Sequence, residues 1–485
     1  MAQLNIVFIA SEAIPLAKTG GLADVAGSLP LALQDLGHKV TVLLPFYRQD
    51  LNNNNITTQP LHTSIEMWVD GQQRQCLLHE AVIDNLRFLL VEQDDLFDRE
   101  GIYGSVGGAY EDNLLRYTLF DRVALEAIAQ MNKPVDIIHC HDWQTGMVPL
   151  LKKTQYIHHP NLTKAKVVFT IHNLAYQGVF PPEWIHRLGL PSQYFHMDGY
   201  EFHNQINCMK AGIEAAHALT TVSPTYAEEI MTPEYGCALE GFLQHHASKL
   251  LGIVNGLDLD AWNPLTDTAI NSNFGAGKIA GKAKCKKALQ QQVGLKVDAK
   301  VPLLTLISRL AEQKGIDLML ANIQAWLDRG YQLVILGSGD ANDEQALTAL
   351  AEANPTQMYF YRGFSEDLAR QIYAAGDMFL MPSRFEPCGL GQLMAMRYGN
   401  VPIVRATGGL KDTVVDYNQD KKQGTGFHFE GAIAEAFDVA VEQAVAVYKK
   451  PTTWSRIRTR ALKRDSSWQA SAEAYVQLYT GLLDD

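Results

Sequence analysis

The chain has 485 residues, of which 47% are hydrophobic and 19% are charged, which is typical of a globular protein with two or three domains. Its 53 acidic residues outnumber its 41 basic residues and give a net charge of −12, which argues against nucleic acid as a partner. The first residues lack a basic segment and a long apolar run, and no stretch approaches the roughly 18 apolar residues of a membrane span. We therefore expect an intracellular protein with no membrane partner.

The six cysteines form no CxxC pair. This spacing argues against a zinc knuckle, a redox dithiol and a disulfide framework. We expect the thiols to be reduced and, with the exception of Cys388 and its neighbours, to serve only as small buried side chains.

Short apolar runs, separated by helical stretches, recur along the first half of the chain. Continuous runs rich in β-branched residues are typical of strands that are covered on both faces, and they predict a parallel sheet with helical crossovers. The runs are NIVFIA (5–10), KVTVLLP (39–45), RFLLVE (87–92), VDIIHC (135–140), KVVFTIH (166–172) and ALTTVS (218–223).

The second half repeats this pattern, so the sequence predicts two doubly wound α/β domains. Its strand candidates are PLLTLISRL (302–310), YQLVILGSGD (331–340), MYFYRG (358–363), DMFLMPS (377–383) and VPIVRA (401–406). Between two of them, SEDLARQIYAAGD predicts an amphipathic helix with Ser365 as its N-cap. Ligands bind beyond the carboxyl ends of such strands, so we expect the two domains to face one deep cleft.

The domain junction is predicted near residues 255–264, just before a polar stretch (267–284) that lacks periodicity and is expected on the surface. The last segment carries an apolar stripe that includes Tyr475 and Tyr479. It predicts a helix that packs on one of the two domains, and the stripe alone does not say which.

The stretch KTGGLADV (18–25) follows the first strand and opens a helix. It matches neither the Walker loop nor the GxGxxG fingerprint. Lys18, Gly20 and Gly21 nevertheless combine a charge, a closely approachable backbone and the positive end of a helix dipole near Asp24. A ligand site and a plain glycine turn are equally compatible with this motif alone.

Two segments of the second half offer groups for an anionic sugar ligand. Arg309 and Lys314, in SRLAEQKG, follow a strand and could clamp a diphosphate or could be a solvated surface pair. In SRFEPCGLGQ, Glu386 precedes the helix opening at 389–391, whose free backbone amides could hold phosphate oxygens. Glu386 could bind sugar hydroxyls or stabilise a cationic sugar carbon, or it could simply cap the turn.

Two segments of the first half, HCHDWQTG (139–146) and TIHNLAYQG (170–178), also follow strands. His172 could act as a general base, although a lone histidine at a strand end is more often hydrogen-bonded scaffolding. Asp142 beside Trp143 is typical of sugar recognition, with the carboxylate for hydroxyls and the ring for the apolar face. A second glycine pair, in ATGGLKDTV (406–414), follows the last predicted strand of the second half.

Taken in order, these motifs resemble the bacterial glycogen synthases and plant starch synthases over essentially the whole chain, and KTGGLADV with SRFEPCGL is the most specific part. The resemblance implies the GT-B fold, with two Rossmann-like domains and a last helix that crosses back to the first. The implied bounds are 1–255 with helix 466–485 for the acceptor-side domain, and 256–465 for the nucleotide-sugar-binding domain. The implied reaction transfers glucose from ADP-glucose to the non-reducing end of an α-1,4-glucan with retention of configuration, without metal or cofactor. The implied location is the bacterial cytoplasm or a plastid-like stroma.

The resemblance also implies roles for individual residues. Catalysis would involve Glu386, His172 and the three cations that hold the diphosphate, Lys18, Arg309 and Lys314. The implied donor site adds further positions, namely Gly20, Gly21, Asn173, Asn255, Phe364, Cys388, Gly389, Leu390 and Gly391. The acceptor side would include Asp24, Asp142 and Trp143.

Retention usually proceeds through a carboxylate nucleophile. No second carboxylate has an obvious place here, so we favour front-face substitution, in which the leaving phosphate takes the proton of the incoming hydroxyl.

Three positions depart from the family pattern. Gly391 replaces the usual threonine near the phosphates, Met394 stands where many related enzymes have a second glutamate, and Phe364 replaces the tyrosine that stacks on adenine.

Three other functions compete with this interpretation. A sucrose- or trehalose-forming transferase shares the fold, but KTGGLADV and EPCGL argue against it. The absence of GxGxxG after a strand argues against a nicotinamide-dependent oxidoreductase. An inactive glucan-binding relative would leave Lys18, Arg309, Lys314 and Glu386 idle.

Overall fold

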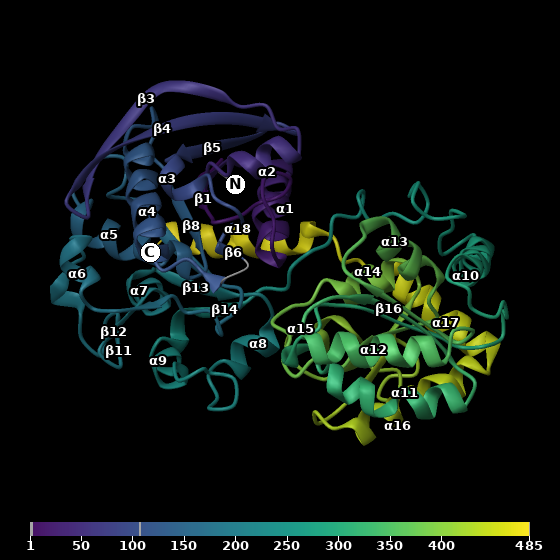
Figure 1. Cartoon of the computed structure of the whole chain (residues 1–485). Coiled ribbons are helices and arrows are strands. Elements are labelled where there is room, and N and C mark those ends of the chain that lie inside the picture. Colours follow the sequence, from purple (N-terminus) through teal and green to yellow (C-terminus); the bar gives the residue numbers. More distant parts are fainter. Residues whose placement is uncertain (1–2, 106–107, 485) are drawn as a thin grey trace. The chain divides into compact units, whose positions relative to one another are not determined.

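The computed structural model describes residues 3–105 and 108–484. Its internal contacts divide the chain into two compact units, Met1–Gly256 with Trp468–Asp485 (unit 1) and Leu257–Ser467 (unit 2). Each unit is built around its own sheet (Figure 1).

The main sheet of unit 1 has the strand order β14-β13-β9-β8-β1-β2-β5-β4-β3. Neighbours from β14 to β5 pair in parallel, whereas β4 pairs antiparallel with both β5 and β3. The strands are β1 (Asn5–Ile9), β2 (Lys39–Pro45), β3 (Gln59–Val69), β4 (Gln72–Ile83), β5 (Leu86–Glu92), β8 (Ile137–His141), β9 (Lys166–Ile171), β13 (Ala218–Thr221) and β14 (Leu250–Gly252). The six strands predicted for this half are confirmed.

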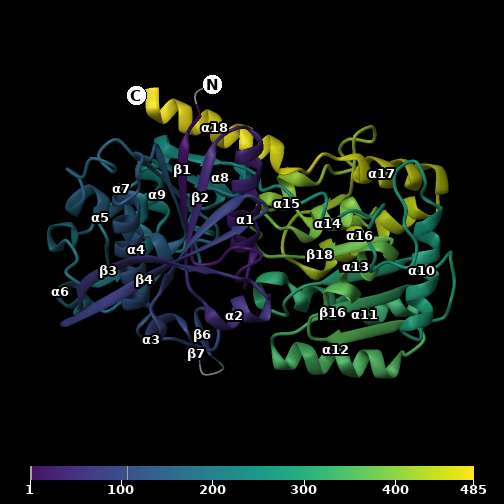
Figure 2. The same cartoon turned by 90° about the horizontal axis from the view of Figure 1, so that it is seen from above.

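Helices cover the parallel part of this sheet (Figures 1 and 2). The helices of unit 1 are α1 (Gly21–Asp35), α2 (Arg48–Asn53), α3 (Asp94–Phe97), α4 (Asn113–Ala129), α5 (Met147–Gln155), α6 (Trp184–Arg187), α7 (Cys208–Ala215), α8 (Pro224–Glu229), α9 (Glu240–His245) and α18 (Trp468–Asp484). Small ladders join β6 (Gly104–Ser105) to β7 (Gly108–Ala109), and β12 (Gln205–Asn207) to β10 (Val179–Phe180) and β11 (Glu201–Phe202).

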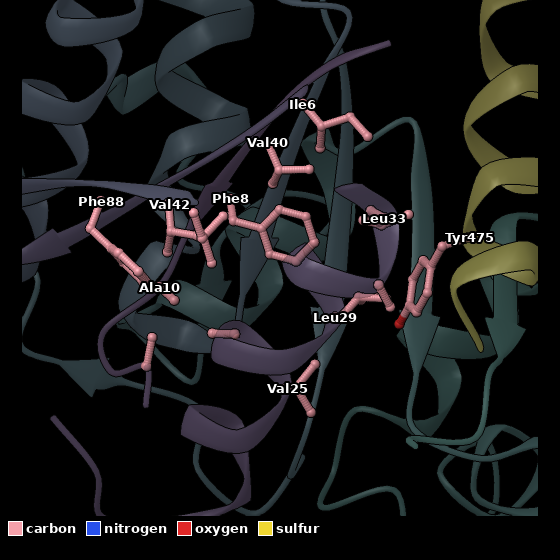
Figure 3. Close-up of a cluster of buried hydrophobic side chains, with 14 of the residues drawn as sticks. Ile6, Phe8, Ala10, Val25, Leu29, Leu33, Val40, Val42, Phe88 and Tyr475 are labelled. Atoms are coloured by element: carbon pink, nitrogen blue, oxygen red, sulfur yellow. The ribbon is translucent and has the colours of Figure 1, made fainter. Parts of the chain in front are cut away.

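The C-terminal helix α18 belongs to unit 1 and packs on α1. Its buried face joins the core that β1, β2 and α1 form, and Figure 3 shows Tyr475 beside Leu29 and Leu33 of α1. The apolar stripe of the last segment is therefore explained, and the return of the last helix to the first domain is confirmed.

Unit 2 contains a wholly parallel sheet with the order β17-β16-β15-β18-β19-β20. Its strands are β15 (Leu303–Ile307), β16 (Gln332–Gly337), β17 (Met358–Arg362), β18 (Met378–Met381), β19 (Val401–Arg405) and β20 (Phe427–Phe429). Its helices are α10 (Ala280–Gln292), α11 (Ile316–Asp328), α12 (Ala341–Ala353), α13 (Glu366–Ala375), α14 (Gly391–Arg397), α15 (Gly408–Thr413), α16 (Ala434–Tyr448) and α17 (Pro451–Lys463). This is the doubly wound arrangement that the sequence predicted.

Two local predictions for unit 2 have different outcomes. The Ser365 side chain accepts a hydrogen bond from the Leu368 amide and caps α13, as predicted. The prediction that residues 267–284 lie on the surface is wrong in part. Ile270 and Phe274 are buried in the hydrophobic cluster that packs on α10 and α13. Isolated apolar residues in a polar context have no periodicity, so the sequence carried no signal for their burial.

Candidate functional site

In unit 2 a cavity of about 220 Å³ opens where β15 and β18 end. It is lined by the loop that follows each strand. The predicted donor-site residues that line it are Arg309, Lys314, Glu386, Gly389, Leu390 and Gly391. The structure thus brings together residues that the sequence separates by more than seventy positions.

Glu386 and Lys314 form an ion pair inside this cavity. The Lys314 Nζ lies 2.6 Å from Glu386 Oε2, and the Ser383 hydroxyl donates to the same oxygen at 2.9 Å. Glu386 is only 6% exposed. Removing one partner of such a pair leaves an uncompensated charge in a poorly solvated place, so each charge depends on the other.

Arg309 differs from Lys314 in having an exposed side chain. Among the interactions of the described residues, its guanidinium takes part in no hydrogen bond or ion pair. A guanidinium at a strand end with its donors uncommitted is suited to a bidentate contact with an anion.

The loop that carries Glu386 is braced from several sides. Arg405, at the end of β19, donates from Nε to the Ser383 carbonyl at 2.8 Å and from its Nη2 to the Arg384 carbonyl. Gln313 donates to the Phe385 carbonyl at 3.2 Å. Arg405 could not be predicted from the sequence, because an arginine that ends a buried strand resembles any residue at a strand boundary.

The second glycine pair supports the same loop. The Gly409 amide donates to the Glu386 carbonyl at 3.0 Å, and a β-carbon at Gly409 would lie 2.2 Å from the Cys388 carbonyl oxygen. The pair therefore allows α15 to approach the Glu386 loop closely.

The remaining predicted positions of unit 2 flank this loop. Gly389 has a φ of +75°, and the Gln392 side chain donates to the carbonyls of Cys388 and Gly389, which fixes the opening of α14. Cys388 is buried. Phe364 follows β17 and is 73% exposed, so its ring face is open for stacking.

In unit 1 the KTGG turn holds its own ion pair and wraps around a carboxylate. Lys18 Nζ lies 2.7 Å from Asp24 Oδ1, so Asp24 contacts Lys18. The Gly20 amide donates to Glu12 Oε2 at 3.2 Å, as does the Thr19 hydroxyl at 2.9 Å. Glu12 was not singled out from the sequence, since no motif marks a glutamate three residues beyond the first strand.

Asp142 holds the loop that carries His172. Its Oδ1 accepts a hydrogen bond from the His172 amide at 2.7 Å, and the Asn173 amide also bonds to this carboxylate. Burial raises the pKa of the Asp142 carboxyl to about 7. Its φ is +57°, which is uncommon for a residue other than glycine and is typical of functional loops.

Trp143 is partly buried in unit 1. Its ring lies edge-on to Tyr117, with ring centroids 5.3 Å apart, and it also contacts Phe180. A β-carbon at Gly178 would lie 2.4 Å from this ring. The face of the indole that Gly178 covers is therefore unavailable to a sugar.

His172 is buried and engaged through one nitrogen. Its Nε2 lies 3.0 Å from Nδ1 of His141. Burial lowers the pKa of the His172 imidazole to about 3, so the ring is neutral near pH 7. A neutral ring can exchange a hydrogen bond with a hydroxyl.

The two predicted asparagines of unit 1 differ in their surroundings. Asn173 Oδ1 accepts from the Ala175 amide at 3.1 Å and closes a local turn. Asn255 is 8% exposed, and its Oδ1 has no hydrogen-bond partner among the described residues.

Two further properties concern the whole described chain. Within residues 3–105 and 108–484, His, Cys, Asp and Glu nowhere gather in threes in a way that could hold a metal ion. No described helix combines the length and the apolar character that crossing a membrane requires.

Comparison with known proteins shows the family to which the chain belongs. A family model described as the starch synthase catalytic domain matches residues 5–245, and one described as glycosyl transferases group 1 matches residues 289–460. Glycogen synthase 2 of Geobacter sulfurreducens is 44% identical over 476 residues, which cover 98% of each chain. The chain belongs to the glycogen synthase and starch synthase family.

Further relatives agree with this assignment. Glycogen synthase of Syntrophotalea carbinolica is 44% identical over 479 residues, 98% of each chain. The catalytic domain of starch synthase IV from Arabidopsis thaliana, solved with ADP and acarbose, matches with a TM-score of 0.91 and 36% identity over 100% of both chains. The resemblance drawn from the motifs and the GT-B fold are thereby confirmed, and the chain is a glucosyltransferase of this family.

A more distant structure shares the fold alone. Sucrose-phosphate synthase of Thermosynechococcus elongatus matches with a TM-score of 0.61 at 18% identity, over 99% of this chain and 100% of that one.

We expect Gly409→Ala to displace the Glu386 loop, because the new methyl group would overlap the Cys388 backbone. The free energy of unfolding of unit 2 should fall by about 1–3 kcal/mol, as for overpacking in general. Urea denaturation measures this loss. The matched control is Gly481→Ala, where a β-carbon meets nothing within 4 Å and a helical position should tolerate or favour alanine. Equal stability of the two variants would contradict this role of Gly409.

The raised pKa of Asp142 predicts a pH-dependent contribution to stability. In the folded chain the carboxyl keeps its proton up to about pH 7, whereas in the unfolded chain it loses it near pH 4. The contribution is complete below pH 4 and is lost as the pH rises to 7. We therefore expect the free energy of unfolding of wild type to fall relative to that of Asp142→Asn between pH 4 and pH 7. Above pH 7 the difference between the two should stay constant, and measurements from pH 4 to 8 check this. An opposite slope would mean that the two amide hydrogen bonds outweigh burial.

Proposed function

We propose that this protein transfers glucose from ADP-glucose to the non-reducing end of an α-1,4-glucan with retention of configuration, and releases ADP. The observation that carries the proposal is the cavity of unit 2, where the uncommitted guanidinium of Arg309 adjoins the pair formed by Lys314 and Glu386. The relatives named glycogen synthases support the glucan product, and the ADP and acarbose in the Arabidopsis structure support the ligand classes. The proposed location is the bacterial cytoplasm, where free thiols persist.

In the proposed donor complex, cations neutralise the diphosphate. Arg309 supplies a planar fork and Lys314 a point charge, and Lys18 adds a third cation. The amides from Cys388 to Gly391 hold the distal phosphate. Phe364, whose ring is exposed, stacks on the adenine.

Other residues position the sugar. Glu386 binds the donor glucose near its reacting carbon, and the neutral His172 exchanges a hydrogen bond with a sugar hydroxyl. Asn173 and Asn255 complete the donor side. In this proposal unit 2 binds the nucleotide sugar.

Unit 1 carries the proposed acceptor side. Asp24, Asp142 and Trp143 are assigned to it. Since the Asp142 carboxylate is engaged by two backbone amides, its contribution is to hold the His172 loop in place.

The proposed chemistry is a front-face substitution. The bond from C1 of glucose to the phosphate oxygen breaks while the bond from C1 to the acceptor O4 forms on the same face. The proton of the 4-hydroxyl passes to the departing phosphate oxygen, so no base from the protein is required. Glu386 is held in one orientation by Lys314 and Ser383, which both engage its Oε2. It is suited to stabilise positive charge at C1.

We expect Arg309→Ala to lower kcat/KM for ADP-glucose by about 100- to 1,000-fold, the scale on which loss of one preorganised charge donor acts. Glucan elongation and ADP release with a maltooligosaccharide primer measure the effect. Arg329→Ala is the matched control, because Arg329 is in the same unit and pairs with Asp438 on the surface.

Parallel assays with UDP-glucose and with small-sugar acceptors complete this test. Wild type should use ADP-glucose and elongate the glucan. Transfer to a small sugar in place of glucan would favour a sucrose- or trehalose-forming enzyme, and no transfer from either donor would favour an inactive glucan-binding relative.

A further inference from the structure

The KTGG turn is built around a buried carboxylate. Glu12 follows β1 and is only 3% exposed. Its Oε2 accepts hydrogen bonds from the Thr19 amide, from the Thr19 hydroxyl at 2.9 Å and from the Gly20 amide at 3.2 Å. One carboxylate oxygen therefore gathers three donors from two consecutive residues of the turn.

These hydrogen bonds decide what the turn can offer a ligand. Backbone amides before a helix are suited to bind an anion, but those of Thr19 and Gly20 are already bound to an anion of the protein itself. The remaining charged group is the Lys18 ammonium, whose side chain is half exposed and paired with Asp24 at 2.7 Å. A ligand phosphate therefore meets a lysine on a braced backbone.

The carboxylate and the turn depend on each other. Burying a charged carboxylate is costly unless hydrogen bonds compensate for the lost water, and burial raises the pKa of the Glu12 carboxyl. Most of the compensation comes from Thr19 and Gly20, the two residues directly after Lys18, and the Tyr103 side chain adds a further hydrogen bond. If the carboxylate were removed, the turn would lose three hydrogen bonds, and the backbone at Lys18 would no longer be held in place.

We propose that Glu12 is a positioning residue, which fixes the 18–21 turn and thereby holds the Lys18 ammonium for the donor diphosphate. This inference rests on the proposed function for the role of Lys18. Glu12 acts through the turn and does not touch the substrate, since it is buried and its Oε2 is filled by protein donors.

The first test measures the turn directly. We expect amide hydrogen exchange at Thr19 and Gly20 to become about tenfold faster in Glu12→Ala, because a hydrogen bond to a charged acceptor contributes on this scale. Glu12→Gln keeps an oxygen acceptor and should fall between wild type and Glu12→Ala. It also carries the test if the alanine variant does not fold.

The matched control is Asp136→Ala. Asp136 accepts a hydrogen bond from the Asn5 amide at 2.7 Å at the opposite end of β1. This substitution removes an equivalent contact between a carboxylate and the backbone, at the end of β1 that lies far from the turn. Exchange at Thr19 and Gly20 should remain at the wild-type rate in this variant.

The second test asks whether Glu12 acts through Lys18. We expect Glu12→Ala to lower kcat/KM for ADP-glucose by about tenfold or more, and Lys18→Ala by about 100-fold. The double variant should be no worse than Lys18→Ala alone, because a braced turn without its lysine has nothing to position.

Two results would overturn the inference. One is an unchanged exchange rate at Thr19 and Gly20 in both Glu12 variants. The other is a double variant whose loss of kcat/KM equals the product of the single losses, since Glu12 would then act independently of Lys18. A wild type without transferase activity would refute the proposed function instead, while the exchange measurement would still report on the turn.

Discussion

Buried carboxylates hold the loops at the carboxyl ends of the strands in both units. Glu12 binds the turn before α1, Asp142 binds the loop after β9, and Glu386 pairs with Lys314 after β18. An isolated charge in such places would be costly, so each carboxylate must keep its hydrogen bonds. The same requirement fixes the loops, so the charged groups within each unit are organised before any ligand arrives.

The sheets provide the rigid edges on which these loops depend. In β8 every residue is buried, and in β1 all residues but the first are buried, so the strand ends cannot shift without disturbing the core. The helix α18 extends this core at the far end of the chain. Rigid strand ends suit the charged groups that each unit carries there, because small displacements weaken electrostatic stabilisation.

Much of this architecture could be predicted from the sequence, because buried parallel strands are continuous apolar runs and the motifs stand directly after them. The strands β3 and β4 were missed, since most of their residues are exposed or only partly buried and give no continuous apolar signal. Glu12 and Arg405 were missed for a different reason, as their roles depend on loops that only the folded chain brings to them. Glycines show the same limit. In the sequence, the glycine pair that contains Gly409 resembles a ligand-binding loop. In the structure, Gly409 allows the backbone of α15 to approach Cys388 closely.

In the proposed function Glu386 contacts the sugar, whereas Arg309 and Lys314 neutralise the diphosphate. Calorimetric titration of ADP into wild type and Glu386→Gln, with glucan elongation measured on the same samples, tests it most directly. Removing the negative charge frees the Lys314 ammonium for the ligand, so we expect unchanged or tighter ADP binding together with a loss of transfer rate of about 100-fold or more. A loss of ADP affinity in parallel with the loss of rate would contradict it.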